Sequence, residues 1–237
     1  MRTKVVTFIA LLIAAPADGF GADSHANHGG HPTVFHAFRV EAEFGEGENT
    51  VAAWDIDGWI GTDYNRLAIK AEGEIADGNR EQEELWTMYS GNVAEFWDAQ
   101  FGFRYDDVPD STFYFVAGVE GLAPYYFETE LHLFVSEDGD LSVRLRQEHD
   151  LLITQRLVLQ PYLELNLFAQ DVPELDTGAG FSDGEFGLQL RYEVSRKFAP
   201  YLDLRYERLL GESSGISRHE GEDPEDFLAS IGVRLRF

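Results

Sequence analysis

The sequence has no cysteine, few basic residues and no long apolar run beyond its N-terminus, and each absence excludes a class of protein. Without cysteine there is neither a disulfide nor a thiolate metal site. Only 18 Lys and Arg stand against 43 Asp and Glu, and the formal net charge is −25. That charge argues against nucleic acid and against an anionic lipid surface as partners, and it is compatible with attracting cations.

The N-terminus has the pattern of a secretory signal peptide. Arg2 and Lys4 precede the apolar run 5–15, and the small residues Ala15-Pro16-Ala17 follow. This apolar run is too short for a membrane-spanning helix, which needs about 20 residues. We therefore expect residues 1–22 to be a signal peptide, cleaved after one of three positions: Ala17, Gly21 or Ala22.

From residue 34 onward the hydrophobic pattern alternates with a period of two, which is the period of a β-strand. In "DFLASIGVRLRF" (226–237), for example, apolar residues alternate with Ser, Gly and Arg. The pattern predicts about twelve strands. They span 34–45, 50–60, 65–76, 83–92, 96–106, 112–122, 125–136, 141–152, 157–169, 184–195, 200–209 and 226–237.

The length of these strands and the links between them favour a membrane barrel. Transmembrane strands have about 9–11 residues, whereas strands of soluble domains have about 5–6. Tight turns such as 61–64 follow the even strands, while acidic and often longer links such as 170–183 and 210–225 follow the odd ones. We predict an all-β fold: a transmembrane antiparallel β-barrel over 34–237 in the cell outer membrane, with periplasmic termini. Alternation alone is also compatible with a soluble sandwich.

The stretch "HANHGGHPTVFH" (25–36) holds four of the seven histidines: His25, His28, His31 and His36. Its glycines allow several imidazoles to converge on one metal ion. The alternative is a disordered, solvated tail in which the histidines are incidental. We expect residues 23–33 to be a short disordered tail in the periplasm.

A second candidate site lies on the polar face of the predicted strands. His132 shares that face with Glu128 and Glu130, so it is either a cation ligand or an ion-paired lumen histidine. Met88 shares a face with Trp86 and would reach a metal only if the lumen brought it to His132. We expect most charges on this lumen face, among them Glu72, Glu164 and Glu207, to pair and to obstruct the lumen, because unpaired charge at low dielectric is costly. The alternative is a path for cations.

Other functions are also compatible with such a barrel. A barrel lipase or acyl-modifying enzyme needs a Ser–His pair near the outer rim. His219 has Ser213, Ser214 and Ser217 near it in sequence, while His149 lies toward the periplasmic end, and there is no G-x-S-x-G motif. We expect no enzyme. A passive or adhesive barrel without a dedicated metal site is the other alternative.

Several contiguous stretches resemble the copper resistance protein B family. They are "AWDIDGWIGTDYNRLAIKAEGE" (53–74), "YSGNVAEFWDAQFGFRYD" (89–106), "GLAPYYFETELHLFVSEDGD" (121–140), "EHDLLITQRLVLQPYLELNLFAQD" (148–171) and "FAPYLDLRYER" (198–208). The resemblance covers residues 36–237. It implies an outer-membrane barrel that binds copper and serves copper resistance or homeostasis, by sequestering copper or passing it across the membrane. The implied partners are copper ions, outer-membrane lipid and a periplasmic copper-binding protein or oxidase, with the barrel itself a monomer.

The chain departs from this family in its methionine content. Family members often carry an N-terminal region rich in both Met and His, but here Met1 and Met88 are the only methionines. Thioether sulfur suits Cu(I), whereas imidazole suits Cu(II). We therefore expect Cu(II) as the bound ion. The primary set of candidate ligands is His25, His28, His31 and His36. The secondary set is His132, Glu130 and Met88.

Overall fold

The structure, a computed structural model, describes residues 33–220 and 223–237. The expected signal peptide and nearly all of the expected tail lie outside this part of the chain. The strands are β1 (Phe35–Glu46), β2 (Thr50–Gly61), β3 (Asn65–Ala76), β4 (Asn79–Ala94), β5 (Trp97–Val108), β6 (Thr112–Ala123), β7 (Phe127–Ser136), β8 (Leu141–Glu148), β9 (Leu151–Leu152), β10 (Leu157–Phe168), β11 (Gly180–Tyr192), β12 (Phe198–Leu209) and β13 (Glu225–Arg236). The helices are η1 (Pro124–Tyr126), η2 (Pro173–Leu175) and α1 (Ser213–Glu220). No helix in the described ranges is long and apolar enough to span a membrane.

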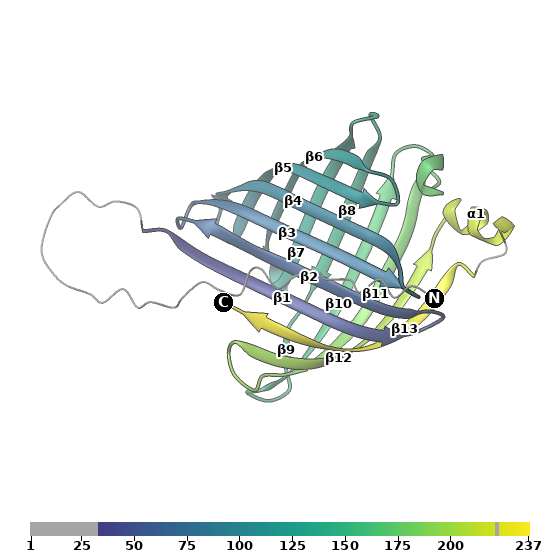
Figure 1. The fold of residues 1–237 in the computed structure, drawn as a ribbon. Helices are drawn as coiled ribbons and strands as arrows, with labels where there is room; N and C mark the ends of the chain where they lie inside the picture. The colour runs from purple at the N-terminus through teal and green to yellow at the C-terminus, as the bar shows by residue number, and fades with distance from the viewer. Residues whose placement is uncertain (1–32, 221–222) are drawn as a thin grey trace, which may run out of the picture. The chain divides into compact units, whose positions relative to one another are not determined.

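The strands form one closed antiparallel sheet (Figure 1). Apart from β8 and β9, each strand pairs with the next along the chain, and β13 pairs with β1 to close the ring. Because β8 and β9 both pair with β10, they occupy one position in the ring, and the barrel has 12 strands. The predicted barrel and its strand number are confirmed.

The predicted eighth strand, 141–152, is interrupted at 149–150 instead of being continuous. The register places His149 opposite Pro161, whose carbonyl accepts a 3.1 Å hydrogen bond from the His149 N–H. Proline has no N–H to return that bond, so the ladder is interrupted there. β9 resumes the pairing beyond the gap.

The two ends of the barrel differ less in their connections than we predicted. The turn end carries the links 62–64, 95–96, 124–126, 153–156 and 193–197, together with the start of β1 and the end of β13. The opposite, loop end carries 47–49, 77–78, 109–111, 137–140, 169–179 and 210–224. Only the last two are long. The link between β3 and β4 is a two-residue turn, in which Asp77 (φ 48°) and Gly78 (φ 84°) take the left-handed conformations of a tight hairpin.

The two faces of the sheet are inverted relative to a soluble protein. Large apolar side chains point outward and are exposed, for example Phe103 (64%) and Ile231 (62%). Charged side chains point into the lumen and are buried, for example Lys70 (4%) and Arg191 (1%). This is the arrangement of a barrel with lipid outside and a polar interior.

The lumen is filled unevenly. An apolar cluster of Ala68, Trp86, Met88, Tyr114, Val116 and Phe134 fills the side lined by β3 to β7. On the other side, tyrosine rings cover glycines of the neighbouring strand. A Cβ added at Gly187 would lie 2.0 Å from Cζ of Tyr162, and one added at Gly232 would lie 2.3 Å from Cζ of Tyr201. Glycine at these two positions lets the rings lie flat against the wall.

Candidate functional site

The primary set of predicted copper ligands falls almost wholly outside the described residues. His25, His28 and His31 lie there, and only His36 is placed. It is the second residue of β1, exposed, on the outer face at the turn end and opposite Ile60. The structure therefore does not bring His36 to the lumen residues of the secondary set.

The secondary set lies in the lumen, where each member already has protein partners. His132 is buried, with Nε2 2.8 Å from Oε1 of Gln100 and its ring edge-on to Trp86 at 5.3 Å between centroids. Glu130 accepts a hydrogen bond from the Lys70 ammonium and lies 4.0 Å from Nδ1 of His132. Met88 is fully buried in the apolar cluster. Within 33–220 and 223–237 the structure holds no group of three or more His, Cys, Asp or Glu arranged to bind a metal ion.

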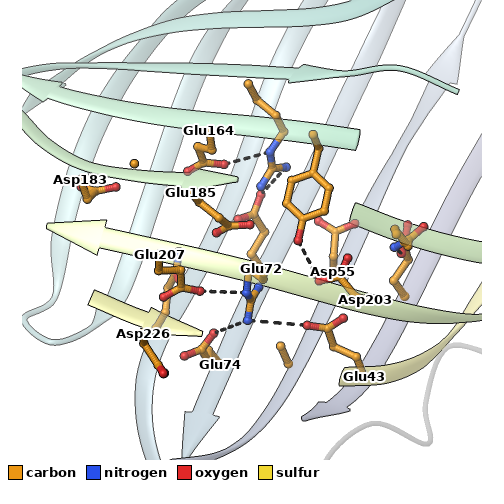
Figure 2. A pocket seen from close by; sticks show the side chains of 18 of the residues that line it. Glu43, Asp55, Glu72, Glu74, Glu164, Asp183, Glu185, Asp203, Glu207 and Asp226 are labelled. Atoms are coloured by element: carbon orange, nitrogen blue, oxygen red, sulfur yellow. Dashed lines mark hydrogen bonds and ion pairs between the residues drawn. The ribbon is translucent and has the colours of Figure 1, made fainter. Parts of the chain in front are cut away.

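The barrel contains an acid-lined cavity of about 600 Å³ (Figure 2). It reaches the loop end, where residues 223–226 line it. The ten labelled acidic residues in Figure 2 are Glu43, Asp55, Glu72, Glu74, Glu164, Asp183, Glu185, Asp203, Glu207 and Asp226. Only six basic residues line the same cavity: Arg39, Arg144, Arg146, Arg205, Arg208 and Arg234. The lining therefore has an excess of negative charge.

These carboxylates belong to longer rows that follow the strand register. Residues directly opposite one another on neighbouring strands have Cβ atoms about 4.5–5.5 Å apart. Going from β5 to β13, one such line on the lumen face, here called the long acidic row, consists of Asp98, Glu120, Glu130, Arg146, Glu164, Glu185, Glu207 and Asp226. Arg146 is its one basic member.

The long acidic row crosses the whole barrel. Asp98 is the second residue of β5, which begins at the turn end, and Asp226 is the second residue of β13, which begins at the loop end. A line of directly opposed residues runs from one end of the barrel to the other in this way because barrel strands are tilted and staggered. On the other wall, a second line of directly opposed residues, here called the short acidic row, runs from Arg234 of β13 to the loop end of β5. Between these two ends it consists of Glu41, Asp55, Glu72, Glu84 and Asp106.

Basic side chains bridge the two walls. Arg144 reaches from β8 to Glu84 of β4, with 3.1 Å between Nη2 and Oε1, and Arg146 reaches Glu72 of β3 at 3.5 Å. Lys70 of β3 forms ion pairs with Glu130 and, at 3.4 Å, Glu120. These bridges cross the lumen, so the predicted network of paired charges is present.

A second network of buried polar side chains lies nearer the turn end. Nε of Arg234 lies 2.7 Å from Glu41. Gln160 accepts hydrogen bonds from Arg234 (3.1 Å) and Arg191 (2.8 Å) through the same Oε1 atom, and Arg191 also forms an ion pair with Asp150. Both arginines and Gln160 are buried.

Some carboxylate oxygens in the cavity have no hydrogen-bond partner among the residues that the structure describes. Glu185 has neither a hydrogen bond nor an ion pair there, although its direct neighbours in the row are Glu164 and Glu207. Asp203 is buried (3% exposed) and accepts a 2.8 Å hydrogen bond from Tyr162 on Oδ2, while its Oδ1 is buried without a partner. Oδ1 of Asp55 is also buried without a hydrogen bond, and its ion-pair partner, Nε of Arg39, lies 4.0 Å away. Such oxygens can accept a cation.

The residues considered for an acyl-transfer site have other contacts. His149 lies at the turn end, as predicted, with Nδ1 3.0 Å from the Tyr126 carbonyl and its ring stacked on Phe127. Ser213 is buried and accepts a 3.0 Å hydrogen bond from the Gly178 N–H.

Sequence reasoning identified several of the cavity acids but not their alignment. It placed Glu72, Glu164 and Glu207 on the lumen face and missed Glu41, Glu84 and Glu185. The alternation of each strand is the signal that places these residues on the same face. Which acids lie opposite one another depends on the register between strands, which alternation does not determine.

Comparisons with known proteins bear on this barrel. The family model described as "Copper resistance protein B precursor (CopB)" matches residues 33–237. The chain is 39% identical over 186 residues to "Copper resistance protein B" of Escherichia coli, covering 78% of this chain and 63% of that protein's length. It is 34% identical over 218 residues to the "Copper resistance protein B homolog" of Pseudomonas syringae pv. tomato (strain ATCC BAA-871 / DC3000), covering 90% of this chain and 74% of that protein.

Solved structures with a similar fold are porins at low sequence identity. The KdgM porin superposes with a TM-score of 0.56 at 10% identity, covering 84% of this chain and 99% of that chain. The NanC porin does so with a TM-score of 0.57 at 12% identity, covering 84% and 98%. These similarities concern the fold, and with the family match they identify an outer-membrane β-barrel.

Proposed function

The chain belongs to the copper resistance protein B family, and on that basis we propose that it binds copper ions at the outer membrane and sequesters them on its periplasmic side. Membership supports a role in copper resistance. The proposed ligands are the histidines of residues 25–36, with Cu(II) as the ion because imidazole suits it and methionine is scarce.

One observation carries this proposal. Four of the seven histidines lie in the segment that leads into β1, and β1 begins at the turn end, where β13 also finishes. In outer-membrane barrels the end with short turns is the periplasmic one. Histidines attached at this end meet copper in the periplasm. His132 in the lumen is hydrogen-bonded to Gln100, so the N-terminal histidines are the better ligands.

A calorimetric titration with Cu(II) tests the proposal. We would compare the refolded chain carrying residues 23–237 with a His25/His28/His31→Gln variant, and use His219→Gln as the control outside the segment. The expected result is binding at micromolar or better affinity that the triple variant loses and the control keeps. Equal binding by the triple variant would move the site onto the barrel. No binding by any of the three would favour a passive or adhesive barrel.

The pH dependence of binding provides an independent check. Imidazole must be neutral to bind a metal ion, and it titrates at about pH 6.5 when unperturbed. Binding through histidines is therefore complete above that pH and lost as the pH falls through it. We expect the Cu(II) affinity to fall by at least about tenfold between pH 7.5 and pH 5.5. A site built mainly from carboxylates would retain most of its affinity over this range.

A further inference from the structure

We propose that the long acidic row is a path for small inorganic cations through the barrel, and that Arg146 and Lys70 close it. This activity goes beyond copper binding and does not require that copper be the ion. It rests on where the register places the charges, the cavity beside them and the carboxylate oxygens left without a partner.

The first observation is the continuity of the row between the two mouths. Asp98 stands at the turn end and Asp226 at the loop end, and every position between them except Arg146 is a carboxylate. Like charges placed directly opposite on neighbouring strands destabilise a sheet. Acidic rings and rows in a pore lining are the usual basis of cation selectivity. A destabilising arrangement that extends from mouth to mouth fits a function in the lumen better than a role in stability.

The second observation is that part of the path is open and part is closed. From the loop end to Glu164, the row lines the cavity of about 600 Å³. Asp203 and Glu185 both line it: Oδ1 of Asp203 is buried without a hydrogen bond, and Glu185 forms neither a hydrogen bond nor an ion pair with a described residue. This half of the path has room for a hydrated ion and unsatisfied acceptors for it.

The closed part begins at Arg146. This residue borders both the large cavity and a void of about 10 Å³ on its far side, which Lys70, Glu130 and His132 also line. Its Nη1 lies 3.5 Å from Glu72 on the opposite wall. Behind it, the Lys70 ammonium lies among Asp57 (3.5 Å), Glu120 (3.4 Å) and Glu130. Two fixed positive charges therefore occupy the places where a mobile cation would otherwise bind.

Conductance in planar lipid bilayers tests the path directly, with KCl as the only salt. We expect Arg146→Gln/Lys70→Gln to raise the conductance of the full chain at least about fivefold and to shift the reversal potential toward K⁺ selectivity. Arg80→Gln is the matched control, because Arg80 is exposed at the loop end and its loss leaves the lumen unchanged. An equal rise with Arg80→Gln would overturn the proposal, as would an anion-selective pore in the double variant.

A second measurement leaves Arg146 and Lys70 in place, so it does not depend on the folding of the double variant. The chain has no cysteine, so Glu185→Cys introduces a single reactive thiol into the cavity. We expect a cationic methanethiosulfonate to modify it at least about tenfold faster than an anionic one of similar size, relative to Glu81→Cys on the exposed start of β4. Equal relative rates would mean that the cavity does not select cations. Neither experiment uses copper, so copper binding and cation passage can fail independently.

Discussion

At the scale of single residues, the lumen of this barrel is filled by buried charges that pair across and along it. Arg234 is 4% exposed and forms an ion pair with Glu41, while Arg191 is 1% exposed and forms one with Asp150. A buried pair contributes little net stability compared with apolar residues of the same size, but removing one partner leaves the other charge uncompensated. The strongest effects of mutation should therefore come from breaking pairs.

Arg234→Met should destabilise the barrel. It removes the nearer of the two arginines that pair with the buried carboxylate of Glu41 and leaves Arg39 at 3.4 Å. The expected loss in free energy of unfolding is about 1–3 kcal/mol. Urea unfolding in lipid vesicles, followed by tryptophan fluorescence, would measure it. Adding Glu41→Gln to the same chain should restore part of the loss, and a double variant as unstable as the single one would contradict this account.

Glu185 and Glu164 should respond to neutralisation in opposite directions. Glu185 has like charges on both sides in its row and forms no ion pair or hydrogen bond with a described residue. Glu185→Gln should therefore raise the free energy of unfolding by about 0.2–1 kcal/mol for each repulsive pair that it removes. Glu164 lies 2.9 Å from Arg146 and 3.3 Å from Arg144, so Glu164→Gln should lower it. The same urea titration compares the two variants, and a loss of stability in Glu185→Gln would show an unrecognised partner.

At the scale of strands, alternation in the sequence predicted the number and approximate bounds of the barrel strands but not how they meet. The break between β8 and β9 depends on Pro161 lying opposite His149, and the sequence does not show this register. The tight turn at Asp77-Gly78 is visible as a local signal, but the acidic residues after it suggested a longer link. Strand identity is a local property, whereas register is set by pairing across the sheet.

The glycines beneath the tyrosine rings should not tolerate side chains. In Gly187→Ala the new methyl group would meet the ring of Tyr162, and we expect a loss of about 1–3 kcal/mol in free energy of unfolding. Gly215→Ala is the control, because nothing lies within 4 Å of a Cβ there and α1 accepts alanine. The two variants can be compared on SDS gels, where the folded barrel migrates faster than the unfolded chain. The measured quantity is the temperature at which the faster band disappears. Equal shifts would mean that contact with the ring is unimportant.

At the scale of the whole molecule, the sequence alone indicated a membrane barrel, a polar interior and an acidic surplus. It did not reveal that the acids form continuous rows, because the stagger of the strands determines which residues become neighbours. Nor did it show that His132 would be engaged by Gln100, a residue from a different strand. Composition and alternation predict the class of fold, and the register determines the electrostatics of the lumen.

The net charge of −25 should make the stability of the barrel depend on ionic strength. Charge of one sign in excess opposes the compact state, and salt screens exposed charges over a distance of about 10 Å at 0.1 M. We expect the unfolding temperature in vesicles of uncharged lipid to rise between 10 mM and 200 mM KCl. A fall would show that favourable ion pairs at the surface outweigh the repulsion.

The uneven filling of the lumen also has a consequence for how the barrel assembles. Every residue of the apolar cluster comes from β3 to β7, a run of consecutive hairpins whose contacts are close in sequence. Contacts of this kind form early in folding because little chain entropy is lost in closing short loops. The rest of the barrel includes the pairing of β1 with β13, which lie at opposite ends of the barrel sequence. It has no comparable apolar cluster among the residues that the structure describes. We expect this segment to act as the nucleus on which the remaining strands add, with the β1–β13 seam closing last.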